Sequence, residues 1–203
     1  MIDTRGIARR IAAPVALALA TTLVLAGCGA APFLDQPDAT PTPTSSGEIT
    51  SIQNDLATGS TERQVAAGNI GVAVNYWSDL AMDQWTPGVN KPLNLSLTAT
   101  LTNDEGQRVY LSQVSVVAAV SGKKGALTAP ASLQDRSSVS PGYLVKSPYS
   151  YSQTFVLPAL DPAATSISLA ITYELLLQTT PTSAEYAKQT ATDTLTIAIA
   201  PTK

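Results

Sequence analysis

Residues 93–102 read Leu93-Asn94-Leu95-Ser96-Leu97-Thr98-Ala99-Thr100-Leu101-Thr102, and this stretch decides the fold. Apolar and polar side chains alternate along all ten residues, which is the period of a β-strand with one buried and one solvent-exposed face. Strands of a parallel sheet covered on both faces are instead continuously apolar. The stretch therefore predicts an antiparallel sheet with one covered face.

The same period extends in both directions from this strand. Upstream, residues 70–77 alternate, with Ile70, Val72, Val74 and Tyr76 on one face. Downstream, residues 109–120 change their apolar phase near Ser112-Gln113, which predicts a β-bulge or a switch between sheets. Further strands are predicted at 149–157, 166–177 and 194–200, and turns at 103–106 and 121–125.

About seven strands within residues 69–203, without a long helical pattern, predict an all-β domain: an antiparallel β-sandwich with Greek-key connections. In this pattern the domain resembles the immunoglobulin-like ectodomains of bacterial surface proteins. The cysteine pair of antibody domains is absent, because the chain has one cysteine. The core must therefore stabilise the domain without an intrachain disulfide.

The N-terminal region has the pattern of an export signal. Arg5, Arg9 and Arg10 precede an apolar run from Ile11 to Leu25, which is shorter than the roughly 20 residues that a membrane-spanning helix needs. The run ends in Leu25-Ala26-Gly27-Cys28, which resembles the lipobox of bacterial lipoproteins. The resemblance implies removal of residues 1–27 and acyl chains on Cys28, so that the protein is anchored on the outer side of the cell membrane. The export route stays open between the general and the twin-arginine pathway.

Residues 28–68 are predicted to be a lipidated N-terminus and a flexible tether. Alternating Pro and Thr from Thr40 to Thr44 favour an extended, solvated backbone. Ser and Thr beside Pro are also typical of O-glycosylated stalks. Within this tether, residues 48–67 could form a short helix. Ile49, Ile52 and Leu56 have helical spacing, but Thr50, Ser51 and Gly59 weaken a helix.

Charge and composition exclude several functions. Removal of residues 1–27 reduces the 12 basic residues to 9 and the 15 acidic residues to 14, and a net negative chain does not suit nucleic-acid binding. The chain has no histidine, which removes the commonest general base and the usual zinc or copper ligand. We therefore predict no metal, no cofactor and no enzymatic activity. Asp79 and Asp83 could form a catalytic carboxylate pair, but solvated surface charge is the favoured interpretation. Asn103-Asp104-Glu105 could bind calcium, but a turn is the favoured interpretation there.

Aromatic residues indicate where the domain could bind a partner. Trp and Tyr anchor interfaces well, because they bury much area with few rotatable bonds. A first candidate surface is the connection after residue 75, although one Trp of a sandwich is usually in its core. A second is the crossing from 121 to 148, whose tyrosines could instead cap a sheet. The candidate binding residues are Tyr76, Trp77, Met82, Trp85, Tyr143, Tyr149 and Tyr151.

These observations predict a lipid-anchored, non-enzymatic interaction protein on the outer side of the membrane. The resemblance to small actinobacterial lipoproteins implies an accessory subunit on a membrane protein complex, such as the respiratory cytochrome bcc–aa3 supercomplex. The alternative is a carrier with a lipid or a glycan in a groove lined by Trp77, Trp85 and Tyr143.

Overall fold

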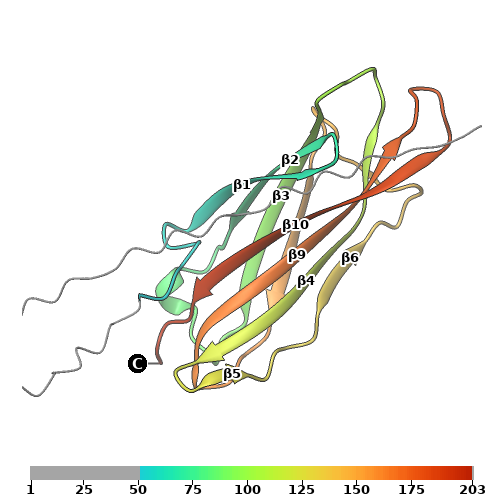
Figure 1. Ribbon diagram of the computed structural model, residues 1–203. Coiled ribbons are helices and arrows are strands. Elements are labelled where there is room, and N and C mark those ends of the chain that lie inside the picture. The colour runs from blue at the N-terminus through green and yellow to red at the C-terminus, as the bar shows by residue number, and fades with distance from the viewer. Residues whose placement is uncertain (1–50, 203) are drawn as a thin grey trace, which may run out of the picture. The chain divides into compact units, whose positions relative to one another are not determined.

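The alternating stretch forms β3, Lys91–Leu101, inside the first of two antiparallel sheets (Figure 1). The structure is a computed structural model and describes residues 51–202. Leu93, Leu95 and Leu97 of β3 are at most 1% exposed, which confirms the predicted buried face. The order of this sheet is β1-β2-β3-β8, and its other strands are β1 Ser60–Ala67, β2 Ile70–Trp77 and β8 Tyr151–Leu157.

The second sheet is built around β4, Val109–Gly122, and has the order β10-β9-β4-β5. Two short strands, β6 Leu133–Arg136 and β7 Tyr143–Leu144, pair with other parts of β4. The remaining strands are β5 Gly125–Leu127, β9 Ala164–Gln178 and β10 Tyr186–Ala198.

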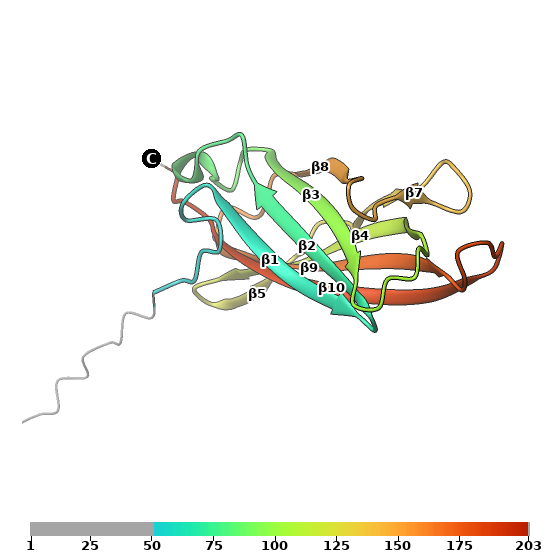
Figure 2. The same cartoon turned by 90° about the horizontal axis from the view of Figure 1, so that it is seen from above.

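The two sheets form the two layers of a sandwich with immunoglobulin-like connectivity (Figures 1 and 2). In that fold, strands A, B and E of one sheet face strands C, F and G of the other. Here β2, β3 and β8 take the first three positions, and β4, β9 and β10 take the others. The predicted β-sandwich is confirmed, with β1 added outside the A position and β8 as the last strand of its sheet.

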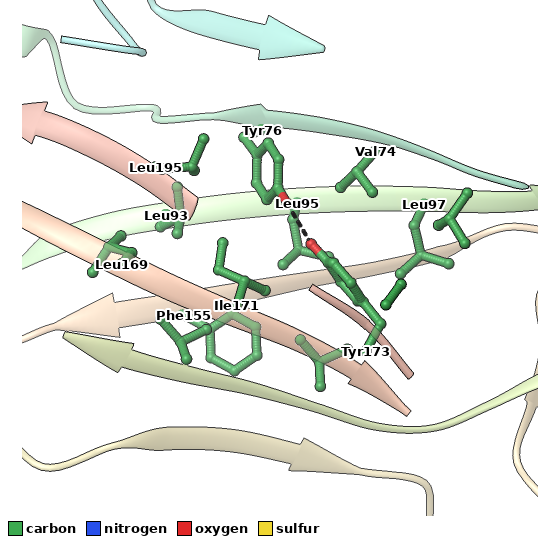
Figure 3. Packing of buried hydrophobic residues seen from close by; sticks show 14 of the residues in the cluster. Val74, Tyr76, Leu93, Leu95, Leu97, Phe155, Leu169, Ile171, Tyr173 and Leu195 are labelled. Carbon is green, nitrogen blue, oxygen red and sulfur yellow. Dashed lines mark hydrogen bonds between the residues drawn. The ribbon is translucent and has the colours of Figure 1, made fainter. Parts of the chain in front are cut away.

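The apolar faces of both sheets meet in one core. Figure 3 shows Leu93, Leu95 and Leu97 of β3 close to Ile171 and Tyr173 of β9. A chain of hydroxyl groups crosses this core: Tyr76 donates to Asp193 Oδ2 at 2.9 Å, and the Tyr173 hydroxyl is hydrogen-bonded to that of Tyr76. Because the single proton of Tyr76 goes to the carboxylate, Tyr173 is the donor in the pair.

The predicted irregularity in the fourth strand is a β-bulge. The register of β4 against β9 shifts between Leu111 and Gln113. The side chain of Ser112, the extra residue, donates to the carbonyl of Glu174 at 3.0 Å. The bulge explains why the apolar phase of the sequence changes there, since one unpaired residue turns the following side chains to the other face.

The boundary predicted between tether and domain is wrong by more than ten residues. Residues 60–67 form β1, paired along its length with β2, so this part of the chain is neither tether nor helix. Leu56 is fully buried, and the backbone N–H of Asp55 donates to the Thr196 carbonyl at 2.8 Å. The sandwich therefore begins near Asn54, not at Asn69.

The long crossing from 121 to 148 is also more ordered than the sequence indicates. It contains β5, β6 and β7, each of which pairs with β4. The described residues thus contain ten strands instead of about seven. The three strands were missed because none is longer than four residues, too short for the alternation to be recognised.

The two ends of the sandwich differ in what they carry. At one end, here called the base, lie residues 51–59, the connections 78–90 and 158–163, the Lys123-Lys124 turn and the C-terminal residues 199–202. At the other end, the tip, lie the connections 102–108 and 179–185. The start of the described chain and its C-terminus both lie at the base (Figures 1 and 2). The predicted signal sequence, lipobox and Cys28 lie outside the described residues.

Candidate recognition surfaces

Two aromatic residues of the first candidate surface belong to the core. Trp85 follows the short 3-10 helix η1, Met82–Gln84, and is fully buried, with its indole N–H donating to Ser78 Oγ at 3.1 Å. Tyr76 is also fully buried. The prediction that these two side chains bind a partner is therefore wrong, since neither is exposed. The connection folds back so that the Trp85 indole closes the base of the sandwich.

Trp77 and Met82 are half-buried, so part of each side chain reaches the surface. Trp77 alternates with Tyr76 along β2 and lies on the outer face of its sheet. A groove lined by Trp77, Trp85 and Tyr143 does not form, because Trp85 is enclosed. The carrier prediction loses the site on which it was based.

The tyrosines of the second candidate surface have different roles. Tyr143 stacks on Tyr151 with ring centroids 5.5 Å apart. Tyr151 is buried and donates to Asp135 Oδ2 at 2.6 Å, and its pKa is raised by burial and then by the Asp135 carboxylate. The Tyr151–Asp135 hydrogen bond links β8 to β6 and stabilises the sandwich. Tyr149 is 57% exposed and remains a candidate for binding.

Tyr149 lies in a cluster at the tip that the sequence does not reveal. Tyr110 of β4 and Tyr186 of β10 form an edge-to-face pair with centroids 5.7 Å apart. The Arg108 guanidinium donates to the Tyr110 hydroxyl at 3.5 Å, the long limit of a hydrogen bond. The pKa of Arg108 is raised by Tyr110 first and then by Tyr186 and Tyr149, and Tyr149 lines the same cleft as Arg108. We call Arg108, Tyr110, Tyr149 and Tyr186 the tip cluster.

A cleft of about 440 Å³ adjoins the tip cluster. Its lining includes Gln107, Arg108, Lys146 and Tyr149. Lys146 donates to the Asp104 carboxylate and to the Gln107 carbonyl, which holds one side of the cleft in place. The pKa of Asp104 is lowered by Lys146 and then by the Gly106 N–H. Asp104 thus stabilises a turn, which is the alternative that the sequence favours over a calcium site.

A larger and more apolar cleft, of about 730 Å³, lies at the base. We call it the base cleft. Its lining is mostly aliphatic side chains and prolines with two lysines at its edge, among them Ile52, Lys123, Lys124, Leu127, Pro162 and Ile199. No sequence pattern indicates it, since its residues come from five separate parts of the chain.

The described carboxylates do not gather into a metal-binding group. Within residues 51–202 there is no group of three potential ligands among His, Cys, Asp and Glu. Asp79 accepts a hydrogen bond from Asn94 Nδ2 at 3.0 Å, and Asp83 is exposed. In the same part of the chain, no helix has the length and apolarity that a membrane span requires.

Comparison of the chain with models of known protein families and with curated proteins found no match.

Proposed function

We propose that the protein is a lipid-anchored, non-enzymatic interaction protein on the outer side of the cell membrane, which docks as an accessory subunit on a membrane protein complex. The observation that carries the proposal is the tip cluster. It presents three tyrosines and one arginine at the end of the sandwich opposite the one that residues 51–59 join.

The composition of the tip cluster suits protein recognition. Tyr and Arg are over-represented among the residues that dominate binding energy, because they bury a large area and still offer hydrogen bonds. Arg108 has no ion pair among the described residues, and its neighbours Tyr110 and Tyr186 are half-buried and therefore preorganised. A partner that covers this surface would order few additional side chains.

The proposed anchor leaves the tip cluster free to reach a partner. From Cys28 to Ile52 there are 24 residue steps. A flexible coil of that length spans roughly 27 Å. The base, where the described chain begins, would face the bilayer, and the tip would point away from it.

The docking proposal is tested by crosslinking in intact cells followed by detergent extraction and mass spectrometry. Wild-type protein should be recovered with an integral membrane complex, and the cytochrome bcc–aa3 supercomplex is the first one to test. The double variant Arg108→Ala/Tyr149→Ala should reduce recovery at least tenfold, since tip residues of this type are expected to dominate the binding.

A matched control is Arg136→Ala/Val139→Ala, which removes one exposed arginine and one exposed apolar side chain that belong neither to the tip cluster nor to the lining of its cleft. This variant should be recovered with the complex like the wild type. Recovery of the wild type alone, or equal loss in both variants, would contradict docking through the tip.

The anchor is tested independently by the mass of the mature N-terminus and by Cys28→Ala. The wild type should carry acyl chains on Cys28, and the variant should be released from the membrane. Two or three chains are needed for firm attachment, since one chain binds only marginally. A variant that is retained as firmly as the wild type would show that the signal sequence stays as a helix.

A further inference from the structure

The base cleft combines an apolar lining with an adjacent pair of lysines. In the mature chain, which has 14 acidic and 9 basic residues, this pair departs from the overall charge. Four other basic side chains are already engaged: Lys91 is buried against two carbonyls, and Arg63, Lys146 and Lys188 each form an ion pair. None of the three ion pairs in residues 51–202 involves Lys123 or Lys124.

The lysine pair is held at the edge of the cleft by the backbone. Lys123 and Lys124 form the turn between β4 and β5, where Gly122 pairs with Gly125. A Cβ atom on Gly122 would lie 2.6 Å from the Ala163 carbonyl, so the hairpin packs directly on the 158–163 connection. The Asp161 carboxylate on that connection accepts the Ala163 N–H at 2.8 Å and forms no ion pair with Lys123 or Lys124. Both ammonium groups are thus exposed beside apolar surface.

We infer that the base cleft with Lys123 and Lys124 docks on a bilayer surface of anionic phospholipid. The inference rests on the proposed function, because the proposed anchor at Cys28 places the base near the bilayer. Lysines beside an anionic membrane gain electrostatic attraction, and aliphatic side chains gain from burial at the headgroup boundary. Docking of the base would hold the sandwich upright and present the tip cluster to a membrane complex.

The experiment uses the full mature chain with Cys28→Ala, so that binding does not depend on the anchor. An introduced cysteine is then the only thiol and can carry an environment-sensitive fluorophore. Ala126→Cys places the label on β5 beside the base cleft, and Thr180→Cys places it at the tip. Both positions are exposed. The probes are vesicles of phosphatidylglycerol and of phosphatidylcholine.

With phosphatidylglycerol, the label at position 126 should shift to shorter wavelengths and the label at 180 should not. Lys123→Gln/Lys124→Gln should weaken binding by roughly 20-fold or more, since each lysine near an anionic surface contributes roughly fivefold. The matched control, Arg136→Gln/Lys188→Gln, removes the same charge elsewhere and should bind like the parent. Ile52→Gln removes an exposed apolar side chain from the cleft and should also weaken binding.

Several results would overturn the inference: equal binding to phosphatidylcholine, equal loss in the control variant, or a spectral shift at position 180. A phospholipid that stays bound through gel filtration would instead make the cleft a carrier site, and concentration-dependent dimerisation through the cleft would make a second copy its occupant. Thermal unfolding of each variant shows whether it is folded. If Cys28 proves unacylated while the labelled chain still docks, the anchor fails and the inference stands.

Discussion

Buried hydroxyl groups are the most unusual side-chain feature of the core. Tyr76 and Tyr173 meet between the two sheets (Figure 3), and a further hydrogen bond leads from Tyr76 to the Asp193 carboxylate. Burial, followed by the neighbouring hydroxyl and carboxylate groups, raises the pKa of Tyr76, and burial likewise raises the pKa of Tyr173. Both side chains are therefore neutral in the folded protein, and their hydroxyl groups join the two sheets, β2 to β9.

Tyr76→Phe should lower the free energy of unfolding at pH 7 by about 1–3 kcal/mol, because the Tyr173 hydroxyl and the Asp193 carboxylate lose a buried partner. The wild type should also lose stability as the pH rises above about 10, where tyrosines of the unfolded chain ionise before the buried ones. This loss should be smaller in the variant. Urea unfolding at pH 7, 9, 10 and 11 measures both effects.

Tyr110→Phe is the control, because Tyr110 lies half-buried at the surface. Equal stabilities of the wild type and Tyr76→Phe at pH 7 would show that the hydroxyl chain contributes nothing.

Lys91 is another buried polar side chain, and its ammonium group donates to the carbonyls of Pro87 at 3.3 Å and Val89 at 2.6 Å. Its burial lowers the pKa of the amine, so protonation favours the unfolded chain. The two hydrogen bonds hold the 78–90 connection against the start of β3. This structural role explains why a lysine occupies a buried position.

At the scale of elements, the first strand depends on the residues that precede it. The Asp55 carboxylate accepts the Thr196 N–H at 2.7 Å and pairs with Arg63 at 2.8 Å. Burial raises the pKa of Asp55, but the hydrogen bonds from Thr196 and Gln53 and the charge of Arg63 outweigh it, and the pKa is lowered. Asp55 thereby ties residues 51–59 to β10 and β1.

Asp55→Asn should lower the free energy of unfolding at pH 7 by about 1.5–3 kcal/mol, the usual contribution of hydrogen bonds to a charged group. A lowered pKa gives stability that is complete above the unfolded value, about 3.9, and is lost as the pH falls through the folded value. The difference between wild type and variant should therefore shrink at pH 3. Urea unfolding at pH 7 and pH 3 tests this.

Asp83→Asn, at an exposed position, is the control and should leave the free energy of unfolding unchanged at both pH values. A constant difference between Asp55→Asn and the wild type from pH 7 to pH 3 would contradict the role of the carboxylate charge.

For the whole molecule, the position of the domain boundary decides what can fold. A chain from residue 51 to 203 keeps β1 and Leu56, and should fold like a chain that begins at Cys28. A chain from 69 to 203 loses the pairing of β1 with β2 and the burial of Leu56, which by itself contributes about 1.5–3 kcal/mol. Since domains are stable by only about 5–15 kcal/mol, the shorter chain should unfold at much lower urea concentration.

Circular dichroism during urea unfolding of both chains measures this difference. Equal midpoints would mean that the sandwich begins at Asn69, as the alternation of the sequence suggests.

The sequence alone determined the sandwich, because the long strands bury one face each and so alternate clearly. It also located an irregularity near Ser112-Gln113 from the change of apolar phase, but it left a bulge and a switch between sheets open, and only the register of β4 against β9 shows the bulge. It could not determine β1, because that strand lies at the edge of its sheet with mostly exposed and half-buried residues and has little apolar alternation.

The tertiary structure alone decided which aromatic residues reach the surface. Trp85 and Tyr76 lie in the same short segment as Trp77, yet only packing shows that the first two are enclosed. The tip cluster joins Arg108 and Tyr110 to Tyr186 across three strands, and the base cleft gathers five distant segments. Local alternation reports which face of one strand is buried, but a surface formed by several strands depends on their pairing and register, which long-range contacts determine.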